Sequence, residues 1–362
     1  MILNFQDKRT LAFWGVVLLL PLLLQSMGNF WVRIADFALL YVLLALGLNI
    51  VVGFAGLLDL GFVAFFAIGA YMYGLLASPH LTETFPWIAQ LFPTGLHVSV
   101  FLAIPLAAVV AGGFGVLLGA PTLKLRGDYL AIVTLGFGEI IRVFLNNLDH
   151  PVNITNGPKG LGQIEAVHLF GLNLGRGINI GGFSLSSVTL YYYLFLVLVV
   201  ASVVVCHRLQ LSRIGRAWMA IREDEIAAKA MGINTRNLKL LAFGMGATFG
   251  GVSGAMFGAF QGFVSPESFS LMESVMIVAM VVLGGIGHLP GVILGAVLLS
   301  ALPEVLRWVS GLLDLQSITG GRLDPAILRQ LLIALAMIIV MLLRPRGLWP
   351  SPEHGKTLRK EV

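Results

Sequence analysis

Long apolar runs constrain this chain more than any other feature, because a transmembrane helix needs roughly 20 mostly apolar residues. The 362-residue sequence contains ten such runs, separated by polar or glycine-rich segments. They cover about 11–30, 34–53, 56–77, 98–119, 128–147, 190–206, 240–260, 271–288, 291–308 and 327–343. The pattern predicts an all-α, polytopic integral membrane protein with about ten transmembrane helices over residues 1–343, followed by a basic tail over 344–362.

Two of the boundaries between runs, near Gly53–Gly56 and near Gly287–Gly291, leave almost no loop. Each is therefore either a full, tight hairpin or a broken, re-entrant helix. A bilayer tolerates broken helices only where protein or a water-filled cavity covers the free backbone groups.

The composition agrees with a membrane protein and excludes several other classes. The chain is 57% hydrophobic and 11% charged, whereas soluble domains carry about 25% charged residues. Many of its 43 glycines lie within apolar runs, where small residues let helices approach closely in lipid. The single cysteine, Cys206, excludes an internal disulfide and a cysteine metal site.

Lysine and arginine residues gather on alternate connecting segments. With the N-terminus in the cytoplasm, the cytoplasmic segments hold sixteen of the 23 lysines and arginines; these segments are 1–10, 120–127, 207–239 and 344–362. The outer segment 148–189 carries only Lys159 and Arg176. We therefore expect both termini to be cytoplasmic, and the net charge of +5 needs no nucleic-acid partner. The first apolar run lacks an A-x-A-like cleavage site, so we expect an uncleaved first span.

No motif in the sequence indicates that the chain itself is an enzyme. The tripeptide GKT at 355–357 lacks the earlier glycine and strand of a phosphate-binding loop, so it belongs to the basic tail. The segment GGIG at 284–287 lacks the context of a dinucleotide fingerprint and indicates a helix break or a packing point. The seven histidines show no metal-like spacing, and we expect no cofactor bound by this chain.

Ionisable residues within apolar runs usually face a cavity or a partner, because burying charge in lipid is costly. The candidates for a substrate path are Asp59, Glu139, Arg142 and Glu273. Glu139 and Arg142 are three residues apart on one helix, so they could instead form a structural ion pair. Asp59 follows a glycine-rich entry, so it lines a substrate cavity or caps a helix break. Glu273 could lie at the outer mouth.

The segment 207–239 concentrates ten of the 41 charged residues of the chain. Asp224 is a favourable N-cap, Glu225 suits the positive end of a helix, and Gly232 suits a left-handed C-cap. These signals predict a short helix from Glu225 to Met231 with an apolar or small face. It could rest on lipid, but three consecutive acids oppose binding to an anionic leaflet. Docking into a groove of a cytosolic protein is the favoured interpretation.

Four stretches of the sequence resemble the permeases of branched-chain amino acid ABC transporters, in the order found in that family. They are GLLDLGFVAFFAIGAY (56–71), LKLRGDYLAIVTLGFGEIIR (123–142), GRAWMAIREDEIAAKAMGINTRNLKLLAF (215–243), and QGFVSPESFSLMES with VVLGGIG (261–274 and 281–287). TNGPKGL at 155–161 is also similar to the family. Of the two permease types of that system, the chain looks like the longer, LivM-type subunit.

The resemblance implies an importer of leucine, isoleucine and valine in a bacterial inner membrane. It implies a second related permease, two cytosolic ATPase subunits that use ATP and Mg²⁺, and a periplasmic binding protein received by loop 148–189. The residues that would contact the ATPase are Arg222, Glu223, Asp224, Glu225, Ala227, Ala228 and Gly232.

Three alternatives stay open from the sequence: another substrate, an ion-coupled transporter and a passive channel. Permeases for urea or short amides share the architecture, so the substrate is less constrained than the fold. An ion-coupled secondary transporter needs intramembrane carboxylates, for which Asp59 and Glu139 are the candidates, but it gives the charged inner loop no role. A passive channel predicts uptake without nucleotide.

Overall fold

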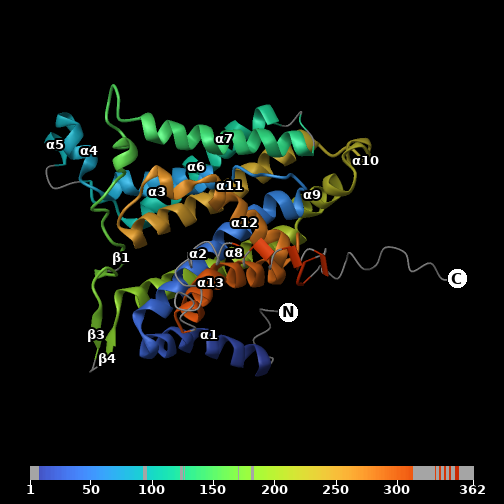
Figure 1. The fold of residues 1–362 in the computed structure, drawn as a ribbon. Helices are drawn as coiled ribbons and strands as arrows, with labels where there is room; N and C mark the ends of the chain where they lie inside the picture. Colours follow the sequence, from blue (N-terminus) through green and yellow to red (C-terminus); the bar gives the residue numbers. More distant parts are fainter. Residues whose placement is uncertain are drawn as a thin grey trace, which may run out of the picture.

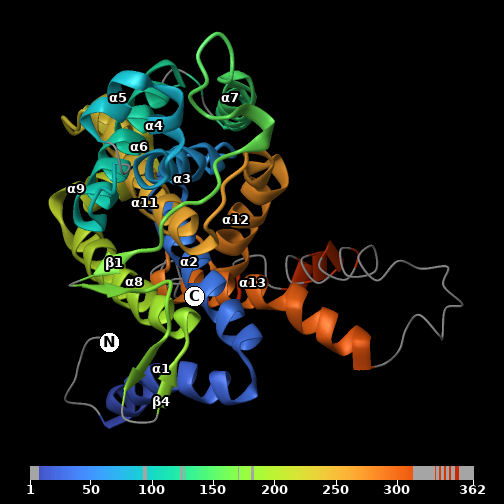
Figure 2. The ribbon, with the colours of Figure 1, turned by 90° about the vertical axis from the view of Figure 1, so that its left-hand side faces the viewer.

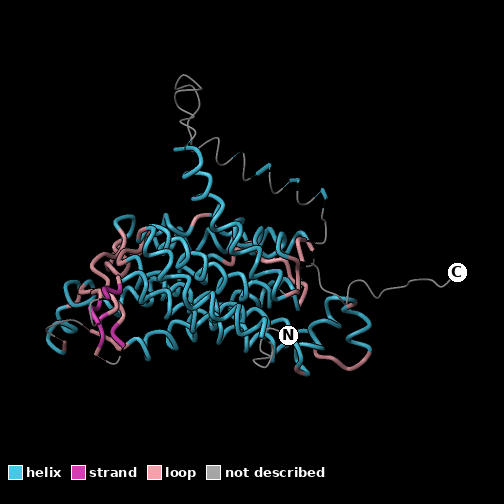
Figure 3. Tube along the Cα trace, turned by 90° about the horizontal axis from the view of Figure 1, so that it is seen from below, coloured by secondary structure: helices cyan, strands magenta, loops and turns pink. Residues whose placement is uncertain are grey.

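The computed structural model describes residues 8–92, 96–122, 125, 127–169, 171–180, 183–312, 331, 334–335, 338–339, 342–343 and 347–349. Within these residues, long helices run roughly parallel or antiparallel to one another as a bundle (Figure 1). Two short β-hairpins lie at one end of the bundle (Figure 3).

The long helices are α1 (Lys8–Met27), α2 (Asn29–Leu48), α3 (Val63–Ala77), α6 (Val100–Thr122), α7 (Asp128–Asn147), α8 (Ser187–Leu211), α11 (Thr235–Gln261), α12 (Leu271–Gly284) and α13 (Leu289–Leu312). The shorter helices are α4 (His80–Thr84), α5 (Pro86–Leu91), α9 (Arg213–Glu223), α10 (Glu225–Ala230) and the 3-10 turns η2 (Gly157–Lys159) and η3 (Pro266–Phe269). A π-helical turn, η1 (Asn49–Phe54), continues α2. The strands are β1 (His168–Leu169), β2 (Leu172–Asn173), β3 (Ile178–Ile180) and β4 (Phe183–Leu185), paired antiparallel as β1–β2 and β3–β4.

Nine of the ten predicted apolar runs coincide with a long helix of the described chain, and the tenth, 327–343, lies mostly outside the described residues. By length and composition, four helical segments of the described residues are suited to cross a membrane: Asn29–Phe54, Val100–Thr122, Ser187–Leu211 and Thr235–Gln261. Shorter apolar helices accompany them at Gly15–Met27, Val63–Ala77, Leu271–Gly284 and Leu289–Val305. The polytopic helical fold is confirmed, and the hairpins within 168–185 are the departure from an all-α chain.

Helix α11 packs against α3 and α6 through glycines. A Cβ atom added at Gly251 would lie 2.6 Å from the carbonyl oxygen of Ala107 on α6. A Cβ atom at Gly254 would overlap the carbonyl oxygen of Phe66 on α3. These backbones are too close to accept any larger side chain, which confirms that glycines in the apolar runs serve helix–helix packing.

Helical structure is interrupted at both boundaries where the sequence leaves almost no loop, here called the two breaks: the first is unwound, and the second is a tight hairpin turn, since a Cβ atom at Gly295 on α13 would overlap the carbonyl oxygen of Met280 on α12. After η1 the chain is unwound from Ala55 to Gly61, and α3 begins only at Val63, seven residues later than the predicted start at 56. The turn between α12 and α13 contains Gly285 and Gly287, both with positive φ. The first boundary is therefore a broken helix rather than a full hairpin.

The described chain has two distinct ends. At one end, here called the α10 end, α9 and α10 lie beside the helix breaks, since Arg222 contacts Gly53 (Figure 1). At the other, the hairpin end, the backbone of Glu165 bonds to Ala77 (N–O 2.9 Å) and that of Leu161 to Val264 (2.8 Å). The predicted inner segment 207–239 and the predicted outer segment 148–189 therefore lie at opposite ends of the bundle.

The C-terminal part of α13 projects away from the other helices (Figures 2 and 3). Farther along, in the predicted tail, Leu348 N bonds to Leu283 O (2.8 Å) and Trp349 N bonds to Gly284 O (3.2 Å). This part of the tail is therefore docked on the α12–α13 turn, and the rest of the tail lies outside the described residues.

Candidate functional site

The charged inner segment forms the helix pair α9–α10. Asp224 ends α9 and caps α10, since its Oδ1 accepts hydrogen bonds from the backbone N–H groups of Ile226 (2.8 Å) and Ala227 (3.1 Å). Gly232, with φ +83°, follows α10 in the left-handed region. Both capping predictions are confirmed, and the helix ends at Ala230, one residue before the predicted Met231.

Glu225 anchors α10 to the base of α11. Its carboxylate lies 2.8 Å from Lys239 Nζ on α11 and 3.2 Å from Lys229 Nζ on α10. Burial alone would raise the pKa of Glu225, but hydrogen bonds from Lys239 and Lys229 outweigh it and hold that pKa below its usual value. Because the Lys239 side chain is only 7% exposed, this pair fixes α10 on the bundle.

The predicted ATPase contacts divide into two groups by the direction they face. Glu223, Asp224, Ala227 and Gly232 are exposed, and so are the apolar Ile226 (68%) and Met231 (83%). In contrast, Ala228 is 4% exposed and packs against its own chain. The Ala228 side chain therefore cannot offer a surface to another protein, which corrects that part of the sequence-based set.

Arg222 also faces its own chain, and its guanidinium donates a hydrogen bond to the carbonyl oxygen of Gly53. Its α9 neighbour Trp218 is fully buried and donates from Nε1 to Leu238 O at 2.7 Å. Helix α9 is therefore held against both η1 and α11, and the exposed apolar side chain Ile226 of α10 lies on the outward surface of the pair.

Asp59 lies in the unwound segment 55–62 and is 1% exposed. Its Oδ1 accepts from Gly61 N at 2.9 Å, and the neighbouring Leu60 N donates to Thr134 Oγ1 on α7 at 3.0 Å. Ser274 Oγ on α12 donates to Leu60 O. Asp59 therefore stabilises a local turn within the unwound segment, and α3 begins at Val63 without a side-chain cap, while contact with substrate stays a prediction.

Glu139 and Arg142 form the structural ion pair that their spacing allows. Arg142 Nε lies 3.0 Å from Glu139 Oε2, and Arg142 Nη1 lies 3.3 Å from Glu267 Oε2 in η3. The three side chains join α7 to the segment before α12. The pair is thus the structural ion pair that the spacing allows, and contact with substrate stays a prediction.

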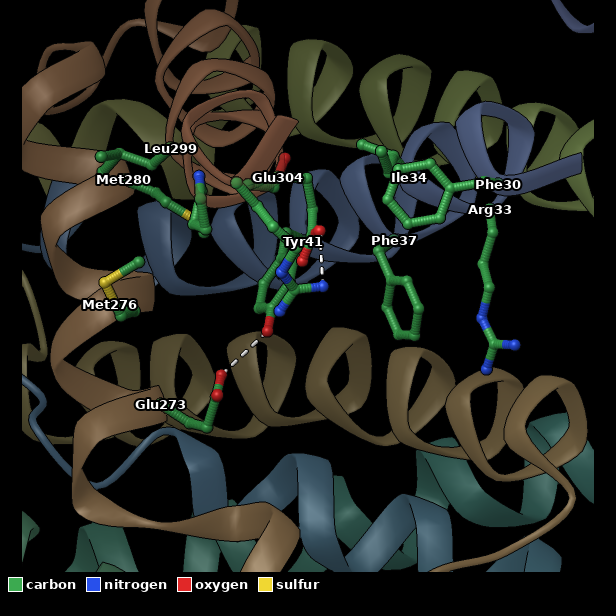
Figure 4. Close-up of a pocket in the computed structure, with 13 residues that line it drawn as sticks. Phe30, Arg33, Ile34, Phe37, Tyr41, Glu273, Met276, Met280, Leu299 and Glu304 are labelled. Carbon is green, nitrogen blue, oxygen red and sulfur yellow. Dashed lines mark hydrogen bonds and ion pairs between the residues drawn. The ribbon is translucent and has the colours of Figure 1, made fainter. Parts of the chain in front are cut away.

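Glu273 lines a cavity of about 370 Å³ between α2, α12 and α13. Figure 4 shows the Glu273 carboxylate reaching from α12 to the hydroxyl of Tyr41 on α2, which donates a hydrogen bond of 2.9 Å. Arg33, Glu304 and Arg307 line the same cavity, and Arg307 pairs with Glu304 at 2.9 Å. Its apolar lining is formed by Phe30, Ile34, Phe37, Met276, Met280, Leu299 and Pro303. Charged groups from three helices therefore meet at a space with apolar walls.

Several buried polar residues were not predicted from the sequence, and two of them lie in α2 and η1. Asp36 lies in α2, is 0% exposed, and its carboxylate has no hydrogen-bond partner among the described residues. The rule that selected Asp59, an acid within an apolar run, also applies to Asp36. Asn49, 0% exposed at the start of η1, accepts a hydrogen bond from Gly287 N at 2.9 Å. No local sequence pattern predicts that contact.

Comparison with known proteins agrees with this architecture. The family model described as branched-chain amino acid transport system / permease component matches residues 30–341. The high-affinity branched-chain amino acid transport system permease protein LivM of Escherichia coli (strain K12) is 42% identical over 331 residues, which are 88% of this chain and 70% of LivM.

The chain matches two more distant relatives over nearly their whole length. The permease protein LivH of the corresponding Escherichia coli system is 26% identical over 321 residues, which are 87% of this chain and 93% of LivH. A probable LivM of Methanocaldococcus jannaschii is 24% identical over 346 residues, 89% of this chain and 94% of the relative. No solved structure matches the chain.

Proposed function

Because this chain belongs to the family of branched-chain amino acid transport system permease components, we propose that it is the membrane-spanning subunit of an ATP-binding-cassette importer. It moves leucine, isoleucine and valine across the bacterial inner membrane. The ATP and Mg²⁺ that drive transport are bound by separate subunits. The substrate class is supported by the names of the LivM relatives and by the zwitterion-compatible mixture of charged and apolar side chains around Glu273.

The single observation that carries the proposal is the outward surface of α10. Ile226 and Met231 are 68% and 83% exposed, although the helix that bears them is capped by Asp224 and anchored through Glu225. A rigid helix with exposed apolar side chains and flanking charges suits a groove in a partner protein. We assign that groove to a cytosolic ATPase, and on the same ground we propose that the α10 end and both termini are cytoplasmic.

The remaining partners follow from the same assignment. The relatives include both LivM and LivH, two differently named permeases, which supports a second permease subunit beside this one. Lipid and that subunit cover exposed apolar side chains such as Ile132 and Phe144 on α7. The hairpin end, including 148–189, then faces the periplasm and receives an amino-acid-binding protein.

Transport proceeds by alternating access in this proposal. ATP binding closes two ATPase subunits, and α9–α10 transmit their movement to the membrane helices. The transported amino acid carries one ammonium and one carboxylate group, so its net charge is zero. The cavity between α2, α12 and α13 supplies matching groups: Glu273 for the ammonium, Arg33 or Arg307 for the carboxylate, and Met276 for the aliphatic side chain.

Reconstitution in proteoliposomes tests the proposal. The chain is combined with its second permease, the two ATPase subunits and the binding protein, and uptake of labelled leucine is measured with and without ATP. We expect uptake that requires ATP and persists with a proton ionophore. Uptake without ATP would indicate a channel, and uptake abolished by the ionophore alone would indicate an ion-coupled transporter. Competition by urea or acetamide, in place of valine, would overturn the substrate assignment.

A double variant and a control variant test the role of α10. Ile226→Asp with Met231→Asp removes the exposed apolar surface without touching the cap or the Glu225–Lys239 pair. We expect the ATPase subunits to be lost on purification while the permease still inserts. The control is Leu172→Asp, which changes a 52% exposed leucine at the hairpin end. Retention of the ATPase by the α10 variant would contradict the docking assignment.

A further inference from the structure

Three segments that are far apart in the sequence meet at the α10 end of the bundle. They are the turn η1 with the glycines that follow it, the last turn of α9, and the turn between α12 and α13. Each of the two membrane-helix breaks described above is thus in contact with the α9–α10 pair.

The side chain of Arg222 is the part of α9 that reaches both breaks. Its guanidinium donates to Gly53 O, the carbonyl near the end of η1. A Cβ atom at Gly56 would lie 2.5 Å from Arg222 Cγ, and one at Gly287 would lie 2.9 Å from Arg222 Nη1. The arginine therefore lies in a space that exists because both neighbouring positions are glycine.

The chemistry of the contact suits its place at the end of a helix. The last carbonyl groups of a helix lack intrahelical partners and carry partial negative charge. A guanidinium offers several N–H donors in a rigid plane, so it can satisfy such a carbonyl and still contact a second segment.

Asn49 links the two breaks to each other. Its Oδ1 accepts from Gly287 N at 2.9 Å, and a Cβ atom at Gly53 would lie 2.8 Å from the same Gly287 nitrogen. The two breaks are therefore in direct backbone contact, and a displacement of one requires a displacement of the other.

The first break continues toward the middle of the bundle. From Ala55 to Gly61 the backbone lacks regular helical hydrogen bonds, so its dihedral angles change more easily than those of a packed helix. Its far end is tied to α7 through Leu60 and Thr134 and to α12 through Leu60 and Ser274. The backbone from Gly53 to Leu60, together with the hydrogen bonds of Leu60, therefore connects the Arg222 contact to two further helices.

We infer that Arg222 is a positioning residue that links α9–α10 to both helix breaks, so that movement of the docked helix pair changes the unwound segment 55–62 and the α12–α13 turn together. The inference rests on the proposed function, because it requires an ATPase that moves α10. It also reassigns Arg222, whose sequence-based role was direct contact with the ATPase.

The test uses the complete importer with Arg222→Ala, Arg222→Lys and the control Arg216→Ala. Arg216 is an exposed arginine of the same helix whose guanidinium, among the described residues, bonds locally to Leu211 O at 2.8 Å. The measured quantity is the number of ATP molecules hydrolysed per leucine imported. We expect Arg222→Ala to retain its ATPase subunits but to raise this ratio about tenfold, the scale of a typical coupling between sites. Arg222→Lys restores part of the coupling, and Arg216→Ala keeps the wild-type ratio.

A second measurement separates a link within the permease from a contact with the ATPase. Hydrogen exchange of the isolated permease should increase in Arg222→Ala for peptides covering 49–62 and 284–290, and not for α6. An unchanged ratio in Arg222→Ala, loss of the ATPase from that variant, or unchanged exchange in both peptides would each overturn the inference. Failure of the proposed function is distinguishable, because the wild-type importer itself would then show no ATP-dependent uptake.

Discussion

The ion pair between Glu225 and Lys239 gives the sharpest quantitative prediction. Replacing Glu225 with glutamine preserves the shape of the side chain but leaves the Lys239 ammonium, in a side chain 7% exposed, without its carboxylate. Breaking a fully buried pair costs about 3–5 kcal/mol. Because the Glu225 side chain is 18% exposed and the amide oxygen still accepts a hydrogen bond, we expect about 2 kcal/mol.

This free energy opposes detachment of α10 from α11, so its loss should be visible as local opening. A change of about 2 kcal/mol corresponds to about thirtyfold in the opening equilibrium. Hydrogen exchange measured by mass spectrometry on peptides covering 224–234 should therefore accelerate by about that factor, while peptides from the centre of α11 keep their wild-type rates.

The control for this measurement is Glu267→Gln. Glu267 also pairs with an arginine, but its side chain is 68% exposed, so its loss should cost no more than about 1 kcal/mol. If Glu225→Gln exchanges no faster than wild type at 224–234, the pair does not hold α10, and the anchoring role assigned to Glu225 is wrong.

The other predictions concern the cap, pH, packing and the cavity. Asp224→Ala with Glu225→Lys removes the cap and reverses the anchoring charge, so the permease should insert while ATPase copurification and leucine uptake fall; unchanged uptake would leave the helix pair without a coupling role. The pKa of Glu225 is lowered in the folded protein. The stabilisation that its ion pair gives to α10 is therefore complete above the unfolded pKa, about 4.3, and is lost as the pH falls through the lower folded pKa. Exchange-competent opening of α10, corrected for the intrinsic pH dependence of exchange, should therefore stay constant from about pH 8 to pH 5 and increase only below about pH 4; an increase already near pH 6 would contradict this. Gly254→Val should lower the thermal unfolding midpoint in detergent, because the new side chain forces α11 away from Phe66 at a cost of about 1–3 kcal/mol. Gly113→Val should leave the midpoint unchanged, because no atom of a neighbouring element lies within 4 Å of its Cβ position. Equal midpoints for the two variants would refute the packing argument. Glu273→Gln should raise the KM for leucine uptake more than Glu267→Gln does, and an unchanged KM would remove the cavity from the substrate path.

Local sequence was sufficient wherever the determining forces are local. The apolar runs identify nine of the described long helices, because a bilayer demands a continuous apolar stretch for each span. The ends of α10 were predictable from Asp224 and Gly232, because a capping side chain and a left-handed glycine act within a few residues of the helix they terminate.

The tertiary structure decided which way the functional side chains face. Sequence placed Arg222, Glu225 and Ala228 in one docking set, yet Arg222 contacts Gly53, Glu225 pairs with Lys239, and Ala228 is buried. These contacts join residues from different helices, and no periodicity within one helix specifies its neighbour.

The same limit explains Asp59 and Glu273. Sequence identified both as acids in apolar surroundings, but only the packing of α2, α7 and α12 buries the first in a local turn and gives the second a tyrosine partner beside a cavity. Hydrophobicity determines which segments cross the membrane, because the hydrocarbon core of the bilayer demands apolar residues along the whole span. Which face a helix turns toward which neighbour depends on close backbone contacts such as those of Gly53, Gly251 and Gly254, and these exist only in the assembled bundle.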